Sequence, residues 1–188
     1  MHFKTIARKV WHFLWKDNSI WSWLANLAIA FVLVKFILYP GMGLFFGTNL
    51  PVVAVVSSSM EHHPGNFDAW WEENKQWYLD RSITKSDFMD YRFKNGFNKG
   101  DIMVIFGAKN VNLGDVVVYN DNKYMYPIIH RVVKVDQEYI TKGDNNSIQD
   151  PKAINTSQIV GKAVFRIPLL GWIKIWFVDL IKMIGGLL

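Results

Sequence analysis

The chain has 188 residues, room for one domain plus an anchor, and a formal net charge of +5. The basic residues are scattered and form no continuous stripe, so this charge does not indicate a nucleic-acid-binding protein. The sequence contains no cysteine, which excludes disulfides, thiol catalysis and cysteine-ligated zinc. Its aromatic content, with 9 Trp and 13 Phe, is typical of a protein that meets a lipid bilayer.

The N-terminal part of the chain predicts a membrane anchor. Residues 20–39 are mostly apolar with Lys35 as their one charged side chain, and 20 residues are enough to cross a hydrocarbon core of about 30 Å as a helix. Residues 1–19 form a basic leader, and basic flanks stay in the cytoplasm. We therefore expect a cytoplasmic N-terminus, a transmembrane helix in the cell membrane and an extracytoplasmic remainder. A cleaved signal peptide is the alternative, but this apolar run is long for one.

Residues 40–167 predict a mainly β catalytic domain outside the membrane. Its first stretch, 40–51, is broken by Pro and Gly, which argues against a second spanning helix and suggests a segment along the membrane surface. The short β-branched run 52–56 then favours a buried strand. Further strands are expected from apolar runs separated by turn residues, at 101–107, 114–121, 126–136, 138–146 and 159–168.

Two segments depart from this β pattern. Residues 62–99 form an insertion that looks helical or irregular, and its Trp70, Trp71 and Trp77 suggest packing or membrane contact rather than a binding cage. Residues 168–188 predict a C-terminal membrane-associated helix, either interfacial or transmembrane. Its charges, Lys174, Asp179 and Lys182, favour the interfacial position, because charges near the middle of a bilayer are costly.

Candidate chemistry begins with the three serines in VVAVVSSSMEHHPG, residues 52–65. A serine hydroxyl is a poor nucleophile until a base takes its proton. His130, in an expected strand, is a candidate base, although a single histidine in a strand is otherwise a core residue. Asp144 and Asp150 follow it, and either could orient the imidazole or simply serve a turn.

These blocks together resemble the type I signal peptidases of the archaeal and endoplasmic-reticulum kind. The resemblance is carried by the N-terminal apolar helix, SSSME at 57–61, IIHRVV at 128–133 and TKGDNN at 141–146, in that order. It implies a signal-peptidase-like β catalytic domain, and a membrane-bound serine endopeptidase that needs no cofactor. Such an enzyme removes N-terminal signal peptides from exported proteins, after small residues of the Ala-X-Ala kind, through an acyl-enzyme.

The same resemblance implies roles for individual residues. Ser59, just before the methionine, matches the nucleophile, and His130 replaces the lysine base of bacterial members. Asp150 matches the better candidate for the triad acid, and Asp144 matches a supporting or alternative acid. The oxyanion hole would combine the Ser57 hydroxyl with the backbone N–H of Ser59. Lys134 and Lys142 become poor candidates for the base.

The substrate is expected to bind as an added strand beside the 52–56 run, against shallow pockets that involve Val55 and Val56. Where many members of the family have proline, this chain has His62 and His63, which we interpret as loop or surface residues. Zinc binding by these two histidines and Asp68 is disfavoured, because adjacent histidines lack the spacing of helical zinc motifs, so no metal is expected.

Expected partners are preproteins that bear signal peptides, membrane lipid and accessory membrane subunits, but no nucleic acid. Two alternatives stay open at this point. One is a non-catalytic, membrane-anchored β module that binds secreted proteins or lipid. The other is a self-cleaving regulatory protease that uses serine and lysine.

Overall fold

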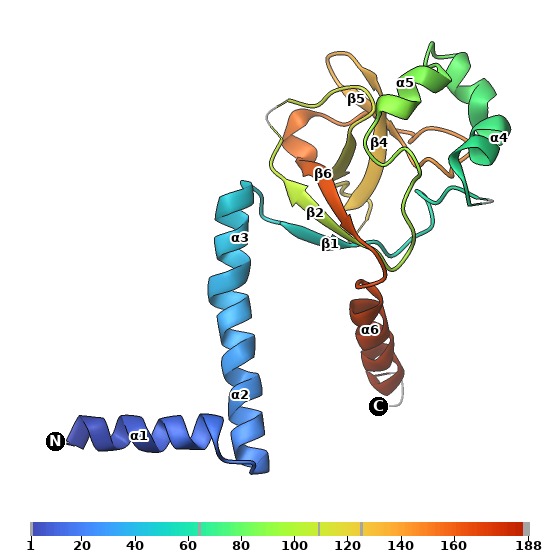
Figure 1. The fold of residues 1–188 in the computed structure, drawn as a ribbon. Coiled ribbons are helices and arrows are strands. Elements are labelled where there is room, and N and C mark those ends of the chain that lie inside the picture. Colours follow the sequence, from blue (N-terminus) through green and yellow to red (C-terminus); the bar gives the residue numbers. More distant parts are fainter. Residues whose placement is uncertain (1, 64, 109, 125, 186–188) are drawn as a thin grey trace. The chain divides into compact units, whose positions relative to one another are not determined.

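The computed structural model describes residues 2–63, 65–108, 110–124 and 126–185 (Figure 1). The chain divides into two compact units, residues 1–45 and 46–188. Helices make up the first unit, and the second is built around a β-sheet with short helices.

The first unit begins with helix α1, His2–Trp15, so the basic leader is helical. Helix α2, Ile20–Leu33, starts after a cap in which the Ser19 side chain accepts a hydrogen bond from the backbone N–H of Ser22. The Ser22 hydroxyl then donates to the Phe13 carbonyl at 2.6 Å, and the Asn26 amide donates to the Leu14 carbonyl at 2.8 Å. These bonds tie the end of α1 to the first turns of α2.

The anchor helix is longer than the sequence predicted. After α2 it continues through the π-helical segment η1, Val34–Leu38, into α3, Tyr39–Phe46. The whole of Ile20–Phe46 has 27 residues and a mean hydropathy of 2.0, and it is long and apolar enough to cross a membrane. Among the residues that the structure describes, it is the one helix that meets both criteria.

The expected break at residue 40 was wrong, and the π segment explains why. A proline inside an α-helix lacks a donor and clashes with the carbonyl four residues back. Here the wider π turn comes immediately before Pro40, and the N–H of Tyr39 bonds the carbonyl of Val34, five residues back. The chain therefore passes Pro40 and remains helical to Phe46; Gly47 follows with a φ of +66°, which glycine adopts readily at a helix end.

The second unit contains a six-stranded antiparallel sheet with the strand order β1-β2-β6-β3-β4-β5. This confirms the mainly β fold class, and each strand expected after residue 100 is present. The strands are β1 Val52–Ala54, β2 Ile102–Phe106, β3 Val116–Tyr119, β4 Ile128–Val135, β5 Tyr139–Lys142 and β6 Ile159–Ile167, with the 3₁₀ helix η2 at Thr156–Gln158.

Strand β1 lies at one edge of this sheet and pairs on one side with β2. Val52 and Val53 are half-buried, so the strand expected at 52–56 exists but is an edge strand and not a fully buried one. The residues that follow it turn back into the protein. Val55 and Met60 are buried in the core with Phe97, so both ends of the serine segment are anchored.

The insertion forms two helices, α4 Phe67–Leu79 and α5 Lys85–Asp90. Asn66 caps the first, and a capping box of Thr84 and Asp87 starts the second. Their apolar faces form an aromatic cluster that packs on Val133 of β4, and its buried aromatic members are Phe67, Trp70, Trp71, Tyr78 and Phe88. Trp77 is partly buried against the same cluster, so all three tryptophans act in packing.

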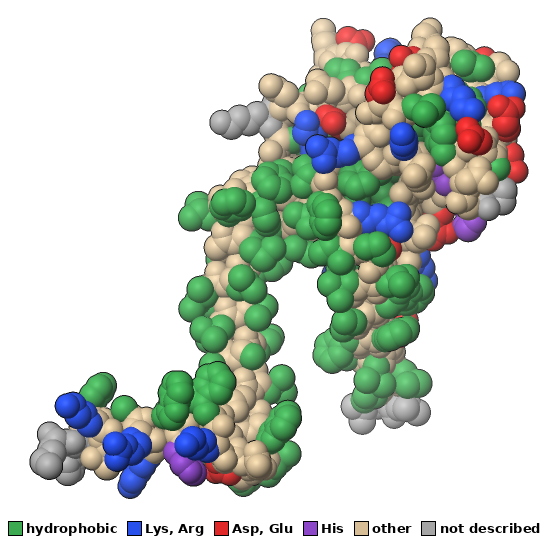
Figure 2. Space-filling model, in the orientation of Figure 1, with side chains coloured by type: hydrophobic (Ala, Val, Ile, Leu, Met, Phe, Trp, Pro, Cys, Tyr) green, Lys and Arg blue, Asp and Glu red, His purple; other side chains and the backbone are tan. Residues whose placement is uncertain are grey.

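Helix α6, Trp172–Gly185, follows β6 and is tethered at its start to the loop before β2. The N–H of Gly171 donates to the Gly100 carbonyl at 2.8 Å, and the Trp172 indole packs against Gly100, where a side chain would not fit. Ile175 is buried. Figure 2 shows hydrophobic side chains along this helix, and the exposed ones are Ile173, Trp176, Phe177, Leu180, Ile181, Met183 and Ile184.

Candidate active site

Ser59 lies where the chain leaves the sheet after β1. The backbone of Val55 still pairs with the loop before β2, through bonds to Asp101 and Gly100 of 2.8 and 2.9 Å. The chain then turns, so that Ser57 and Ser58 are exposed and Ser59 is half-buried. Because Met60 inserts its side chain into the core, the position of Ser59 is set by packing on its C-terminal side.

His130 lies in β4 and hydrogen-bonds two other predicted site residues. Its Nε2 is 3.1 Å from the Ser59 hydroxyl oxygen, and its Nδ1 is 2.7 Å from the Asp150 carboxylate. A carboxylate can only accept, so Nδ1 carries the proton and donates to Asp150. In the neutral ring this leaves Nε2 free to accept from the Ser59 hydroxyl. The sequence placed these three residues 91 positions apart at most, and the fold brings them into one hydrogen-bonded chain.

Two residues that sequence reasoning missed hold Asp150. Its Oδ2 accepts a hydrogen bond from the Thr141 hydroxyl at 2.6 Å and from the Tyr119 hydroxyl at 3.1 Å. Burial favours a higher pKa for Asp150, but the bond from His130 and those from Thr141 and Tyr119 outweigh it, so the pKa lies below its ordinary value. Burial also raises the pKa of Tyr119, which stays protonated and able to donate. The sequence did point to Thr141, since this residue belongs to the TKGDNN block that carries the family resemblance.

Ser57 has its hydroxyl oxygen 3.2 Å from that of Ser59. The two residues predicted to contact substrate differ from each other. Val56 is 56% exposed and lines a cavity in front of Ser59, whereas the side chain of Val55 is 2% exposed and packs in the core. The Val55 side chain therefore does not line this cavity, because alternate residues of a strand point to opposite faces and only one of these two can face it.

The cavity in front of Ser59 has a volume of about 510 Å³. It runs beside β1 and reaches the imidazole and the loop between β3 and β4. Its lining includes Val53, Ala54, Val56, Ser57, Ser59, Tyr119, Ile128, His130, Asn146 and Asp150. The apolar lining beside β1 and the polar groups at Ser59 suit an extended peptide with small apolar side chains.

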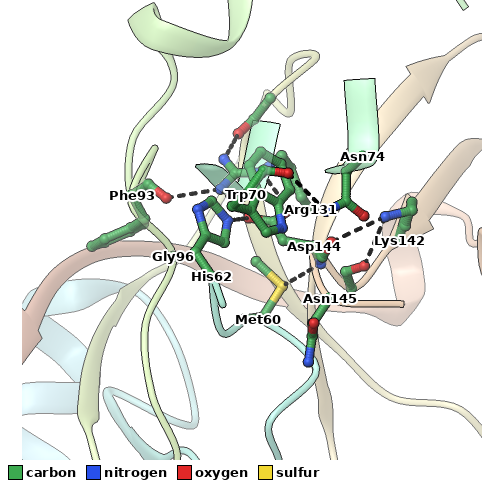
Figure 3. A network of polar contacts seen from close by, with 12 residues as sticks. Met60, His62, Trp70, Asn74, Phe93, Gly96, Arg131, Lys142, Asp144 and Asn145 are labelled. Carbon is green, nitrogen blue, oxygen red and sulfur yellow. Dashed lines mark hydrogen bonds and ion pairs between the residues drawn. The ribbon is translucent and has the colours of Figure 1, made fainter. Parts of the chain in front are cut away.

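Asp144 does not contact the His130 ring; it lies in a separate buried network (Figure 3). Arg131 donates to both of its carboxylate oxygens, at 2.9 and 2.7 Å, and the Nε2 of His62 is 3.0 Å from the second oxygen. Burial alone would raise the pKa of Asp144, but Arg131 and then His62 lower it to about 2. Of the two candidate acids, Asp150 is the one within hydrogen-bond reach of His130.

The two adjacent histidines both lie in a loop, as predicted, but their environments differ, and His62 is buried rather than on the surface. His62 is 5% exposed, and its ring stacks on the indole of Trp70 with centroids 3.8 Å apart. The aromatic insertion covers it, which no local pattern around residue 62 indicates. His63 is exposed and pairs with Glu61 at 2.8 Å, and Asp68 pairs with Lys85 rather than with either histidine.

Lys142 is buried at the end of β5, and its ammonium group bonds the insertion and the backbone that follows it. Its Nζ bonds the Tyr78 hydroxyl at 3.3 Å and the carbonyls of Gly143 and Asp144 at 3.2 Å each. Burial lowers the pKa of Lys142 to about 8. Lys134 is exposed. Neither lysine therefore occupies the position beside Ser59 that a Ser-Lys protease requires.

The mainly β fold, the apolar anchor helix and a serine hydrogen-bonded to a histidine and an aspartate describe a membrane-bound serine hydrolase. Comparison with known proteins gives its family. The chain is 36% identical over 154 residues to the signal peptidase complex catalytic subunit sec11 of Schizosaccharomyces pombe, across 73% of this chain and 74% of that one. The chain therefore belongs to the family of signal peptidase catalytic subunits.

Further relatives carry the same name. The SEC11 subunit of Komagataella phaffii is 31% identical over 138 residues, across 68% of this chain and 61% of its own, and that of Lachancea thermotolerans is 29% identical over 167 residues, across 80% of both. No family model matches the chain. The expected class is confirmed: the protein is a signal peptidase, a membrane-bound serine endopeptidase. The alternative of a non-catalytic β module is thereby excluded.

Proposed function

We propose that Ser59, His130 and Asp150 are the catalytic triad with which this enzyme removes signal peptides from exported preproteins. The observation that carries the proposal is the position of the His130 ring, with Nε2 3.1 Å from the Ser59 hydroxyl and Nδ1 2.7 Å from Asp150. A base in contact with the nucleophile and oriented by an acid is the arrangement that activates a serine.

The reaction proceeds through an acyl-enzyme. The Ser59 oxygen attacks the scissile carbonyl while His130 takes its proton, and the resulting imidazolium is stabilised by the charged Asp150. His130 then returns the proton to the leaving amine as the peptide bond breaks. A water molecule attacks the ester, with His130 again as base, and releases the signal peptide and Ser59.

The oxyanion that forms in each step is stabilised by the Ser57 hydroxyl and the backbone N–H of Ser59. This proposal is supported by the 3.2 Å between the Ser57 and Ser59 hydroxyl oxygens, which puts a donor next to the attacked carbonyl. Removing one such donor commonly costs 10²- to 10³-fold in kcat. Asp144 supports the site from behind through its contacts with Arg131, and does not orient the base.

The substrate binds extended along the free edge of β1. The N–H and carbonyl of Val55 are used inside the sheet, so by alternation the backbone groups of Ala54 and Val56 face the open edge. A peptide that pairs there brings its scissile bond to Ser59 and its side chains to the cavity, which favours small residues of the Ala-X-Ala kind. The Val56 side chain lines this subsite, whereas the Val55 side chain packs in the core and does not touch the substrate.

The proposed setting is the cell membrane, with the N-terminal leader in the cytoplasm and residues 46–167 outside as the catalytic domain. The positive charge of α1 against the apolar 27-residue helix supports this orientation. The exposed apolar side chains of α6 support contact with lipid at the membrane surface. The relatives are named as subunits of a complex, so we further propose that accessory membrane subunits assemble with this chain.

The test compares Ser59→Ala with Ser58→Ala, a neighbouring exposed serine, on a preprotein with a cleavable signal peptide in detergent or vesicles. We expect Ser59→Ala to abolish cleavage and Ser58→Ala to retain it within a few-fold. Cleavage by Ser59→Ala at the wild-type rate would overturn the proposed nucleophile. N-terminal sequencing of the product tests the preference for small residues before the cut.

A further inference from the structure

The buried ring of His62 is packed closely against Trp70 and Gly96. On one face it stacks on Trp70 of α4, with centroids 3.8 Å apart and planes within 3° (Figure 3). Gly96 also lies against the ring, since an added Cβ there would be 2.6 Å from the His62 Cδ2 atom. The residues that pack against the ring, Trp70 and Gly96, therefore come from the beginning and the end of the insertion.

The hydrogen bonds of His62 specify its protonation. The Asp144 carboxylate carries a charge and can only accept, so the Nε2 of His62, 3.0 Å away, is the donor. Its Nδ1 is buried, and among the described residues it has no hydrogen-bond partner. The contact with Asp144 therefore requires a proton on the Nε2 of His62.

Asp144 belongs to a short loop that contacts the nucleophile and the base. The backbone N–H of Asn145 donates to the Ser59 carbonyl at 2.8 Å, and the Asn145 side-chain amide donates to the Ser58 carbonyl at 3.1 Å. Gly143 lies so close that an added Cβ would be 2.7 Å from the Ser59 carbonyl oxygen and 2.9 Å from the His130 Nε2. Any shift of the loop at Asp144 is therefore transmitted to Ser59.

We infer that His62 is a positioning residue for the reaction: its hydrogen bond to Asp144, from a ring stacked on Trp70, holds the loop 143–146 against Ser59 and His130. The inference rests on the proposed function of Ser59 and gives the insertion a role in it. Helix α4 contributes to catalysis by fixing His62. This role requires no contact between α4 and the substrate groove, and no residue of α4 lines that groove.

This role predicts a selective kinetic effect. Arg131 still binds both oxygens of Asp144 when the His62 donor is removed, so the loop stays in place but loses one of its constraints. Displacements well below 1 Å at a nucleophile lower the rate of the chemical step. The groove beside β1 has no contact with His62, so substrate binding is unchanged. We expect kcat to fall and KM to stay constant.

The experiment measures kcat and KM of the full-length enzyme with a signal-peptide substrate for three variants. His62→Phe keeps an aromatic ring for Trp70 but has no donor. His62→Gln restores a donor at the same reach without the ring. His63→Phe is the matched control, since His63 is the exposed neighbour. We expect a ten- to hundredfold loss of kcat in His62→Phe, partial recovery in His62→Gln, and wild-type kinetics in His63→Phe.

Two results would overturn the inference. One is a wild-type kcat in His62→Phe; the other is an equal loss in His62→Phe and His62→Gln that follows their loss of thermal stability. If His62→Phe does not fold, the ¹⁵N spectrum of the wild-type histidine rings decides, because the inference requires a proton on the Nε2 of His62, and an Nε2 without a proton would contradict it. Cleavage that survives Ser59→Ala refutes the proposed function itself, whereas activity lost with Ser59→Ala but kept in His62→Phe refutes only the role of His62.

Discussion

Asp144 and Asp150 are six residues apart in sequence, yet each contacts a different histidine. Asp150 is 2.7 Å from the Nδ1 of His130, and Asp144 is 3.0 Å from the Nε2 of His62 and paired with Arg131. Asp150 therefore orients the proposed base, whereas Asp144 helps to hold the loop that packs against Ser59. Each of these positions has its own consequences when it is changed.

Replacing Asp150 with Asn should remove activity while leaving the fold intact. The amide can no longer hold the His130 tautomer that accepts from Ser59, and a comparable change in a serine protease triad costs about 10⁴-fold in kcat. The measurement is kcat of Asp150→Asn beside its thermal unfolding midpoint. A variant with near wild-type kcat would show that Asp150 does not orient the base.

Replacing Asp144 with Ala should instead destabilise the protein. Arg131 is fully buried and would lose the partner of its charge, for which a cost of about 3–5 kcal/mol is typical. Denaturant unfolding of Asp144→Ala in detergent measures this. A variant as stable as the wild type would mean that the pair contributes nothing, as happens for many exposed ion pairs.

The same acid predicts how stability depends on low pH. The pKa of Asp144 is about 2 in the folded protein and about 3.8 in its ordinary state, so the unfolded chain takes up the proton first as the pH falls. The stabilisation from Asp144, about 2 kcal/mol, is therefore complete above pH 4 and is lost between about pH 4 and pH 2. Unfolding free energies at pH 5 and pH 3 should differ less in Asp144→Asn than in the wild type.

Lys142 predicts a second rise of stability with pH, in the alkaline range, and also tests the Ser-Lys alternative. Its pKa is about 8 when folded against 10.5 ordinarily, so the unfolded chain binds more protons between those values and stability rises with pH there. Lys142→Met should remove this rise. It should also retain signal-peptide cleavage, whereas His130→Ala should lose it; the reverse pattern would make the lysine the base.

Gly143 should tolerate no side chain. An added Cβ would lie 2.7 Å from the Ser59 carbonyl oxygen and 2.9 Å from the His130 Nε2, so it must displace the backbone of Ser59 or the ring of His130, the two residues that exchange the proton. We expect Gly143→Ala to lower kcat by about 10²-fold or more. Gly41→Ala is the control, because a Cβ there meets nothing within 4 Å. Equal activities of the two variants would contradict the tight packing of the loop.

Much of this architecture could be predicted from local patterns. The strands after residue 100 follow from β-branched runs between turn residues, as in Val116–Tyr119. Ser59, His130 and Asp150 could be paired only through a family resemblance, since nothing local joins residue 59 to residue 130. The passage of the anchor helix through Pro40 depends on a π turn that the pattern of Pro and Gly conceals.

The buried state of His62 was beyond local reasoning for a different reason. It depends on Trp70 stacking from α4 and on Asp144 arriving from β5, and both contacts arise only when the insertion packs on the sheet. Without those contacts, two adjacent histidines that follow a polar serine segment are expected to be surface residues. The insertion that seemed to interrupt the β pattern is the element that makes His62 part of the site.

The central claim is that His130 activates Ser59, and covalent capture of the nucleophile tests it most directly. A peptidyl phosphonate ending in Ala-X-Ala should form an adduct that mass spectrometry locates on Ser59, and the rate of its formation should fall by several orders of magnitude in His130→Ala. An adduct on another residue, or capture of Ser59 at an undiminished rate without His130, would contradict the account.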